Sequence, residues 1–257
     1  MENIQAVAFF DLDGTLLNEK SQITQEITTA IQALKENHVL PMIATGRTLV
    51  EIETIMKDSG IDSAIVMNGQ FIQVEGKSVY SNEFTPEECA KMHMHVKQLG
   101  HEISYYNDRH IWCSGHNEIV TNAYKFIHSK PPVIDTTNSE NRPVNMMLVL
   151  SEDGDEHYLE HFPEMTFYRN GPYSIDTVRK GVSKGSGVKN LFQTLNLPKV
   201  PTFAFGDGIN DLALFDACEH KIAMGNARIE LKERSSYVTK NNTDGGIVHA
   251  LKHFDLI

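Results

Sequence analysis

The stretch Val7-Ala8-Phe9-Phe10-Asp11-Leu12-Asp13-Gly14-Thr15-Leu16 decides how this chain of 257 residues is interpreted. Its four apolar residues predict a buried strand, after which two carboxylates two positions apart project toward one side of an extended chain. Gly14 permits a sharp turn of the backbone directly behind them. Two neighbouring carboxylates repel each other unless a cation or a shared proton relieves them, which indicates a Mg²⁺ site. The structural alternative is a strand followed by a solvated Asp-Gly turn.

The composition narrows the class of protein. A hydrophobic fraction of 40% and a charged fraction of 22% are those of an ordinary globular protein. The net charge of −11 disfavours nonspecific binding to nucleic acid or to an anionic membrane. The three cysteines are far apart in the chain and predict reduced thiols rather than a disulfide framework. We therefore expect a cytoplasmic protein that binds neither nucleic acid nor a membrane; the oligomeric state stays open.

Strand and helix patterns alternate in the first third of the chain and again near its end. Apolar runs over 39–44 and 64–67 predict strands, and the apolar spacing over 23–34 predicts a helix. Pro41 is awkward inside a central strand and is expected to mark its start. Strands that alternate with helices imply a parallel sheet covered on both faces. The predicted class is α/β, with a Rossmann-like doubly wound parallel sheet as its core.

The pattern changes near Phe84 and returns near Gly181. Thr85-Pro86-Glu87-Glu88 is typical of a capped helix start, and strands are predicted over 103–106, 110–113 and 144–150. A helix with Ile119, Ala123 and Ile127 on its apolar side is expected between them, and the polar stretch 135–142 is expected to be a loop. This α+β segment predicts a second domain over residues 84–180. It is inserted into a first domain formed by residues 1–83 and 181–257.

Three further motifs follow the first acid pair, and their order carries a family resemblance. They are Ala44-Thr45-Gly46-Arg47, Val182-Ser183-Lys184-Gly185 and Gly206-Asp207-Gly208-Ile209-Asn210-Asp211. With this order of acid pair, hydroxyl, lysine and second acid pair, the sequence resembles the haloacid dehalogenase-like (HAD) phosphohydrolases, and specifically their Cof-type branch. The run Ala223-Met224-Gly225-Asn226-Ala227 also resembles that branch. The resemblance covers nearly the whole chain and implies that the inserted segment is a large α/β cap.

Asp11 and Asp13 are the expected catalytic residues. Asp11 lies directly at the end of a strand, where the backbone holds it most firmly, and is expected to attack phosphorus and form an aspartyl phosphate. Asp13 is then the acid that protonates the leaving alcohol and afterwards the base for the hydrolytic water. The resemblance implies the same two roles.

Asp11 and Asp207 are the expected carboxylate ligands of Mg²⁺, to which the resemblance adds the backbone carbonyl of Asp13. Asp211 lies one helical turn beyond Asp207 and is expected to orient a metal-bound water without binding the metal itself. A structural alternative is that Asn210 or Asp211 caps the helix that starts there. Both roles can hold at once.

The substrate's phosphate is expected to meet Thr45, Gly46, Lys184 and Asn210. Thr45 offers a hydroxyl and, with Gly46, backbone N–H groups, although the same pair is typical of a helix N-cap. Lys184 offers a positive charge at a helix start, although a lysine there is more often a solvated surface residue. Arg47 pairs either with substrate or with a core acid and stays outside the catalytic set. The glycine-rich run 181–187 fits neither the P-loop nor the dinucleotide-binding spacing.

Together these patterns predict a Mg²⁺-dependent phosphatase. Small phosphorylated metabolites, such as sugar phosphates or nucleotide-related phosphates, are implied as substrates by the resemblance only. The cap would close over the core, exclude water and select the leaving group. One alternative is a phosphotransferase or phosphomutase that uses the same aspartyl phosphate. Another is a phospho-ligand-binding regulator without catalysis, which the presence of both Asp11 and Asp13 disfavours.

Overall fold

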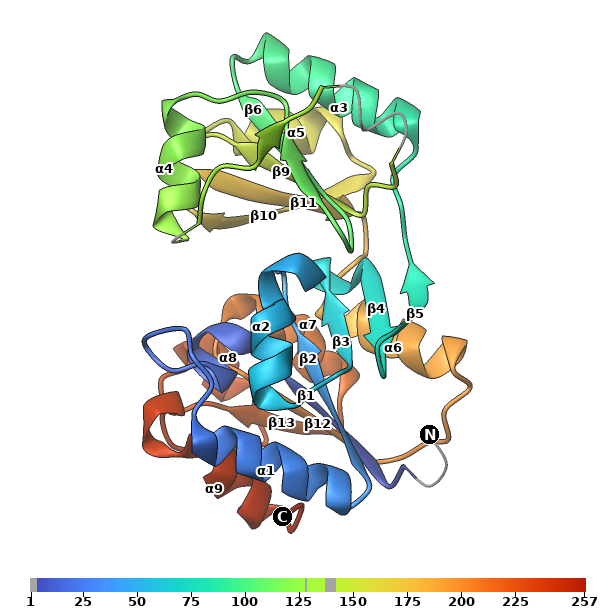
Figure 1. The fold of residues 1–257 in the computed structure, drawn as a ribbon, viewed down its shortest axis with the longest axis vertical. Coiled ribbons are helices and arrows are strands. Elements are labelled where there is room, and N and C mark those ends of the chain that lie inside the picture. Colours follow the sequence, from blue (N-terminus) through green and yellow to red (C-terminus); the bar gives the residue numbers. More distant parts are fainter. Residues whose placement is uncertain (1–3, 128, 137–141) are drawn as a thin grey trace. The chain divides into compact units, whose positions relative to one another are not determined.

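The computed structural model describes residues 4–127, 129–136 and 142–257. The chain divides into two compact units, each built on its own sheet (Figure 1). The first unit comprises Met1–Arg47, Glu51–Tyr80 and Ser183–Ile257, and the second comprises Thr48–Val50 and Ser81–Val182. The predicted fold class is confirmed: a mostly parallel α/β sheet forms the core, and a second, mostly antiparallel sheet belongs to an inserted cap.

The sheet of the first unit has eight strands in the order β14-β13-β12-β1-β2-β3-β4-β5. The strands from β14 to β3 pair in parallel, and β4 pairs with β3 in the antiparallel sense. The centre of the sheet, β1, is buried along its whole length, as the apolar run before Asp11 predicts. The strands are β1 (Ala6–Phe10), β2 (Val39–Ala44), β3 (Ala64–Val66), β4 (Phe71–Val74), β5 (Lys77–Ser81), β12 (Thr202–Gly206), β13 (His220–Ala223) and β14 (Tyr237–Val238).

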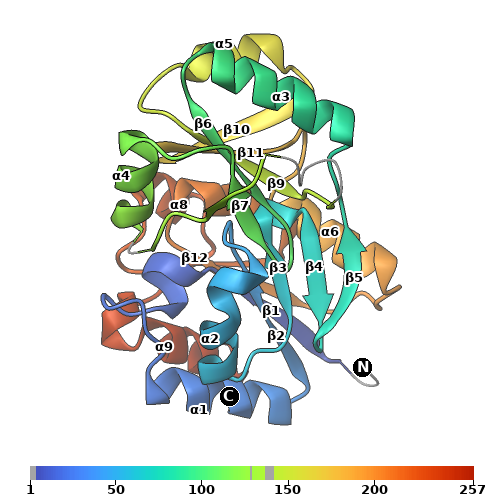
Figure 2. The ribbon, with the colours of Figure 1, turned by 45° about the horizontal axis from the view of Figure 1, so that its top comes forward.

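Helices cover both faces of this sheet. Figures 1 and 2 show α1 and α2 on one face and α6 on the opposite face. Helix α9 packs against α1, and α7 packs against α6, so each face carries its own helical layer. The helices of the unit are α1 (Gln25–Glu36), α2 (Leu49–Ser59), α6 (Lys184–Thr194), α7 (Leu212–Ala217), α8 (Ile229–Glu233) and α9 (Gly246–His253).

Pro41 lies inside β2 rather than at its start, because the strand already begins at Val39. On the side of β2 that faces β3, the N–H groups of Ile43 and Thr45 donate to Ser63 and Ile65. The nitrogen of Pro41 has the same parity and faces the same side, but β3 begins only at Ala64. Proline is therefore tolerated in this central strand, because β3 does not extend far enough to offer a hydrogen-bond acceptor opposite that position.

The second unit has a six-stranded sheet in the order β10-β11-β9-β6-β7-β8. Its pairs are antiparallel except for β7 with β8. The predicted capping box is confirmed at the start of α3, where Thr85 and Glu88 each accept the other's backbone N–H. The elements are α3 (Pro86–Gln98), β6 (Glu102–Tyr106), β7 (Ile111–Cys113), α4 (Glu118–Phe126), β8 (Val133–Ile134), β9 (Met146–Leu150), α5 (Asp155–His161), β10 (Met165–Gly171) and β11 (Ser174–Arg179).

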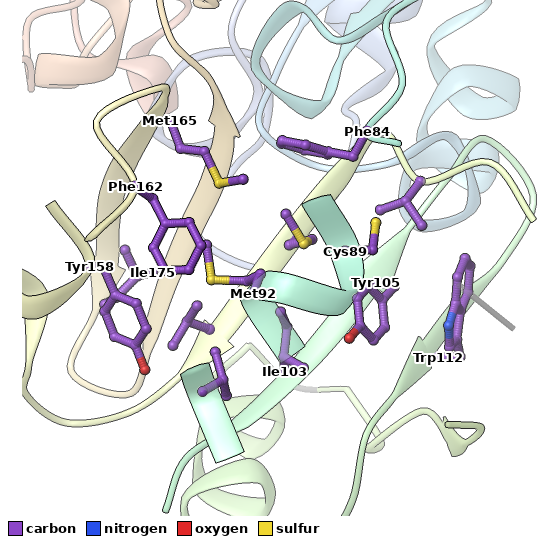
Figure 3. Close-up of a cluster of buried hydrophobic side chains, with 14 residues drawn as sticks. Phe84, Cys89, Met92, Ile103, Tyr105, Trp112, Tyr158, Phe162, Met165 and Ile175 are labelled. Atoms are coloured by element: carbon purple, nitrogen blue, oxygen red, sulfur yellow. The ribbon is translucent and has the colours of Figure 1, made fainter. Parts of the chain in front are cut away.

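The core of this second unit is a cluster of apolar side chains (Figure 3). Cys89 and Met92 of α3 and Tyr158 of α5 meet residues of the sheet, so the two helices and one face of the sheet share one core. Tyr105 and Trp112 stack with ring centroids 5.7 Å apart on neighbouring strands. The unit thus buries its own hydrophobic core, as an inserted domain must.

One detail of the second unit differs from the expectation. The buried residues of α4 are Val120, Ala123 and Tyr124, and Ile119 is half-buried. Of the predicted apolar stripe, Ile127 is wrong, because it follows the end of the helix and is 48% exposed. Residues 137–141 of the expected loop lie outside the described residues.

The three cysteines are free and buried. Within the described parts of the chain, no helix combines the length and apolarity that crossing a membrane requires.

Candidate functional site

The candidate site lies where three neighbouring parallel strands end. Asp11 follows β1, Thr45 follows β2 and Asp207 follows β12. Since β1 pairs in parallel with both other strands, their carboxyl ends meet at one edge of the sheet. Crevices at this edge are the usual ligand sites of open α/β sheets. Lys184 joins them as the first residue of α6.

Lys184 is buried between two carboxylates. Its Nζ lies 2.5 Å from Oδ1 of Asp11 and 2.7 Å from Oδ1 of Asp211, and the residue is only 1% exposed. Burial by itself lowers the pKa of an ammonium group, but here the two carboxylates outweigh burial and raise the pKa of Lys184. The solvated surface lysine that the sequence left open as an alternative is therefore wrong.

The glycine-rich run around Lys184 has a packing cause. A Cβ atom at Gly185 would collide with the backbone carbonyl oxygen of Ala213 in α7. Helix α6 can lie this close to α7 only because that side chain is absent. The close packing places Lys184 in the interior, and Gly185 needs no nucleotide-binding role to explain it.

Asp211 is fully buried and holds three groups at once. Its Oδ2 accepts the backbone N–H groups of Asp207 and Gly208, each at 3.0 Å, while Oδ1 accepts Lys184. A carboxylate offers about four acceptor positions, so most of its capacity is used. Asp211 thereby fixes both the turn that presents Asp207 and the ammonium group beside Asp11.

The carboxylates of Asp11, Asp207 and Asp211 form a compact acidic cluster. One oxygen from each lies within 4.8 Å of the others, and no second group of three or more metal-ligating side chains is so arranged among the described residues. Burial, with the nearby Asp211 carboxylate, raises the pKa of Asp11 to about 8, and the same two causes raise that of Asp207 to about 6. When all three carboxylates are ionised, they leave two negative charges against the one ammonium group of Lys184. A divalent cation with a preference for oxygen ligands, such as Mg²⁺, fits this donor set in charge and in chemistry.

The turn after Asp11 is fitted to Asp207. Gly14 has φ of +75°, and a Cβ atom there would collide with the carboxylate of Asp207. The hydroxyl of Thr15 donates to Oδ1 of Asp207 at 3.3 Å. The contribution of Thr15 was not predicted from the sequence, although its place directly after the acid pair and the glycine was the available signal.

Asp13 forms a two-point ion pair with Arg47. Nε of Arg47 lies 3.0 Å from Oδ2, and Nη2 lies 2.5 Å from Oδ1. The side chain of Arg47 is 32% exposed and that of Asp13 is 59% exposed. The pair therefore lies at the rim of the acidic cluster rather than inside it. Of the two partners left open for Arg47, the acid is the one that it contacts.

Thr45 is buried, and its hydroxyl accepts the backbone N–H of Arg47 at 3.2 Å. Helix α2 begins only at Leu49, so Thr45 is not its N-cap. Gly46 is half-buried beside it, whereas Asn210 is exposed on the turn that carries Asp211. Thr45 and Gly46 thus lie at the sheet edge with Asp11, and Asn210 lies at the outer side of the Asp207 turn.

Asn226 ties the acid turn to a distant loop. Its Nδ2 donates to the carbonyl oxygen of Gly14 at 2.8 Å, and its Oδ1 accepts the backbone N–H of Asn242 at 2.9 Å. The Nδ2 of Asn242 in turn donates to the carbonyl of Leu17. Asn226 stands in a run noted only for its resemblance, and its contact with Gly14 depends on how two loops meet, which no local sequence pattern fixes.

Comparisons with known proteins agree with this architecture. A family model described as haloacid dehalogenase-like hydrolase matches residues 8–251. The chain is 28% identical over 250 residues to YkrA of Bacillus subtilis, covering 97% of each chain. It is 27% identical over 272 residues to 5-amino-6-(5-phospho-D-ribitylamino)uracil phosphatase YwtE of the same species, covering 93% of this chain and 94% of YwtE.

Solved structures are similar over the full length. A protein of Geobacillus kaustophilus HTA426 superposes with a TM-score of 0.91 at 31% identity, covering 98% of this chain and 99% of that one. The HAD subclass IIB sugar phosphatase BT4131 superposes with a TM-score of 0.83 at 27% identity, covering 98% and 100%. With its parallel core sheet, its inserted cap and a family match over nearly its whole length, the chain belongs to the haloacid dehalogenase-like hydrolases, in their Cof-type subfamily IIB.

Proposed function

We propose that this chain is a Mg²⁺-dependent phosphatase that hydrolyses small phosphorylated metabolites through an aspartyl phosphate on Asp11. It is a HAD-like phosphatase, that is, a phosphoric monoester hydrolase. The observation that carries the proposal is the buried cluster in which Lys184 lies between Asp11 and Asp211 while Asp207 stands beside them. Such a cluster places a carboxylate nucleophile, a fixed positive charge and an excess of negative charge at one sheet edge.

Two displacements account for the reaction. The carboxylate of Asp11 attacks phosphorus while the bond from phosphorus to the leaving oxygen breaks, and Asp13 gives its proton to that oxygen. Water then attacks phosphorus, Asp13 takes its proton, and the bond to Asp11 breaks to release inorganic phosphate. Asp13 ends each cycle with the proton with which it began.

The remaining residues would bind and orient. Asp11, Asp207 and the backbone carbonyl of Asp13 would hold Mg²⁺, which when bound supplies positive charge to the transferring phosphoryl group. Asp211, whose oxygens are mostly occupied, would orient a metal-bound water and keep Lys184 in place. Thr45, Gly46, Lys184 and Asn210 would bind the phosphoryl oxygens.

The inserted residues 84–180 would form the cap that selects the leaving group, on a core of residues 1–83 and 181–257. The substrates that we propose are phosphate esters of sugars or related polyhydroxylated compounds. The names of two relatives support this class, since one is called a sugar phosphatase and the other a phosphatase of a phosphoribityl compound.

Turnover of a generic aryl phosphate with Mg²⁺ tests the proposal. Asp11→Asn should lose nearly all activity, because an amide is a poor nucleophile for phosphorus. Asp216→Asn, which neutralises an exposed carboxylate of the same unit, is the matched control and should keep it. Full activity of Asp11→Asn, or an inactive wild-type protein across a panel of phosphate monoesters with Mg²⁺, contradicts the proposal.

A further inference from the structure

The ion pair between Arg47 and Asp13 sits where the proposed acid meets the proposed phosphate-binding turn. The backbone of Arg47 is fixed on both sides, since its N–H donates to the hydroxyl of Thr45 and its carbonyl accepts the N–H of Met67 at 3.0 Å. Its guanidinium then reaches both oxygens of Asp13 with two different nitrogens. Two parallel contacts of this kind fix the orientation of a carboxylate as well as its position.

We infer that Arg47 is a positioning residue that aims the carboxyl group of Asp13 at the leaving oxygen of the substrate. The inference rests on the proposed function of Asp13 as the proton donor. Asp13 is more than half exposed, so the packing of its neighbours does little to hold its side chain. Among the described contacts, Arg47 supplies the two that fix its carboxyl group in one orientation.

The chemistry of a guanidinium limits how this works. Arg47 has only donors, so an oxygen of Asp13 that carries the transferable proton cannot face it. During proton transfer one oxygen therefore stays on Arg47 and the other turns to the leaving group. A single retained contact still restrains the carboxyl group, and misplacing a catalytic group by about 1 Å can cost about 100-fold in rate.

Leaving-group dependence distinguishes this role from phosphate binding. An alkyl phosphate expels a strongly basic alkoxide and needs the proton from Asp13, whereas 4-nitrophenyl phosphate expels a stable phenolate and needs it much less. For Arg47→Met, kcat/KM for the alkyl ester should fall about 10- to 100-fold further than kcat/KM for the aryl ester. Arg47→Lys, which keeps one donor group, should recover part of that difference. Both values come from one protein sample, so their ratio does not depend on the fraction that is folded.

A double-mutant cycle tests whether Arg47 acts through Asp13. In the background of Asp13→Asn, adding Arg47→Met should change the alkyl-to-aryl ratio by less than about twofold, because the group that Arg47 aims is already lost. Arg234→Met is the matched control, since it removes an arginine paired with Asp216 on the surface of the same unit. It should leave both kcat/KM values as in the wild type.

The outcomes separate the two proposals. If Arg47→Met lowers kcat/KM equally for both esters, Arg47 binds the phosphate directly and the inference is wrong. If it lowers the ratio as much in the Asp13→Asn background as alone, Arg47 acts on the leaving group without Asp13, and the inference is wrong as well. A wild-type protein that hydrolyses neither ester with Mg²⁺ overturns the proposed function instead. An unchanged ratio in Arg47→Met, with an active wild type, overturns the inference and leaves the proposed function standing.

Discussion

Lys184 and Asp11 form a buried ion pair in which Nζ lies 2.5 Å from Oδ1. Charges removed from water are stable only within a balanced set, and Asp211 and Asp207 make this set more negative than Lys184 alone can offset. The arrangement is therefore a poor way to stabilise a fold and a good way to hold a reactive carboxylate beside a cation.

Lys184→Met should destabilise the metal-free protein by about 3–5 kcal/mol, because it leaves two buried carboxylates without their cation. Urea denaturation near neutral pH measures this loss, and turnover should fall with it. Lys221→Met is the matched control: its Nζ lies 3.8 Å from Asp216 at the surface, and its loss should cost less than about 1 kcal/mol. Equal losses for the two variants would show that the buried pair contributes no more than a surface contact.

The members of this cluster could be predicted from the sequence, because each stands at a recognisable end of an element in the same α/β unit. Asp11 and Asp207 directly follow strands of the parallel sheet, and Lys184 begins a helix that packs on that sheet. Topology then brings Asp11, Asp207 and Lys184 together, whatever their separation along the chain. The burial of Lys184 could not be predicted, since its neighbours Ser183 and Ser186 are polar and the run is rich in glycine. Only the close packing of α6 on α7 makes that position an interior one.

Residues that act across loops were harder to foresee than residues within motifs. The partner of Arg47 depends on where two turns meet, and sequence reasoning left two partners open. In the fold itself, element types were predicted well, because hydrophobic period and capping are local signals. The error at α4 arose because its apolar residues 119, 120, 123, 124 and 127 span more than one face, so the pattern alone does not fix which face is buried.

Gly14→Ala and Gly76→Ala form a matched pair. Both glycines have nearly the same backbone angle, φ of +75° and +74°, but a Cβ atom meets the carboxylate of Asp207 at Gly14 and nothing within 4 Å at Gly76. Each variant should lose about 1–2 kcal/mol from the left-handed backbone alone. Gly14→Ala should in addition weaken Mg²⁺ binding at least about tenfold, since it displaces a proposed ligand. Calorimetric titration with Mg²⁺ measures this, and equal affinities in the two variants contradict the fit between Gly14 and Asp207.

Stabilisation by Mg²⁺ should grow with pH. Burial raises the pKa of Asp11 from 3.8 to about 8 and that of Asp207 from 3.8 to about 6, so the metal-free folded protein holds protons that the unfolded chain has released. The stability that these two carboxyl groups give the metal-free folded protein is greatest below their pKa of 3.8 in the unfolded chain. That stability is lost as pH rises through about 6, where Asp207 ionises, and then about 8, where Asp11 ionises. Mg²⁺ competes with those protons for the carboxylates, so it binds best at a pH at which the carboxylates have lost them.

Melting temperatures with and without Mg²⁺ across this range measure the effect. The increase caused by Mg²⁺ should be small below about pH 5 and large near pH 8. Asp207→Asn, which removes one of the two titrating carboxylates, should flatten the dependence. An increase of the same size at both ends of the range contradicts the assignment of Mg²⁺ to these carboxylates.

Asn226 should support the acid turn rather than the fold as a whole. Asn226→Ala removes the donor to the carbonyl of Gly14 and the acceptor of the N–H of Asn242, which are exposed hydrogen bonds worth about 0.5–1.5 kcal/mol each. Asn226→Ala should therefore lower kcat. Asn226→Asp keeps the acceptor but turns an oxygen toward the carbonyl of Gly14, so it should lower kcat at least as much as the alanine variant does. Asn241→Ala removes a side chain that donates to Asp244 within its own loop, and it should leave kcat unchanged. Steady-state kinetics of the three variants decide the point, because a purely structural asparagine would change the melting temperature and leave kcat as it is.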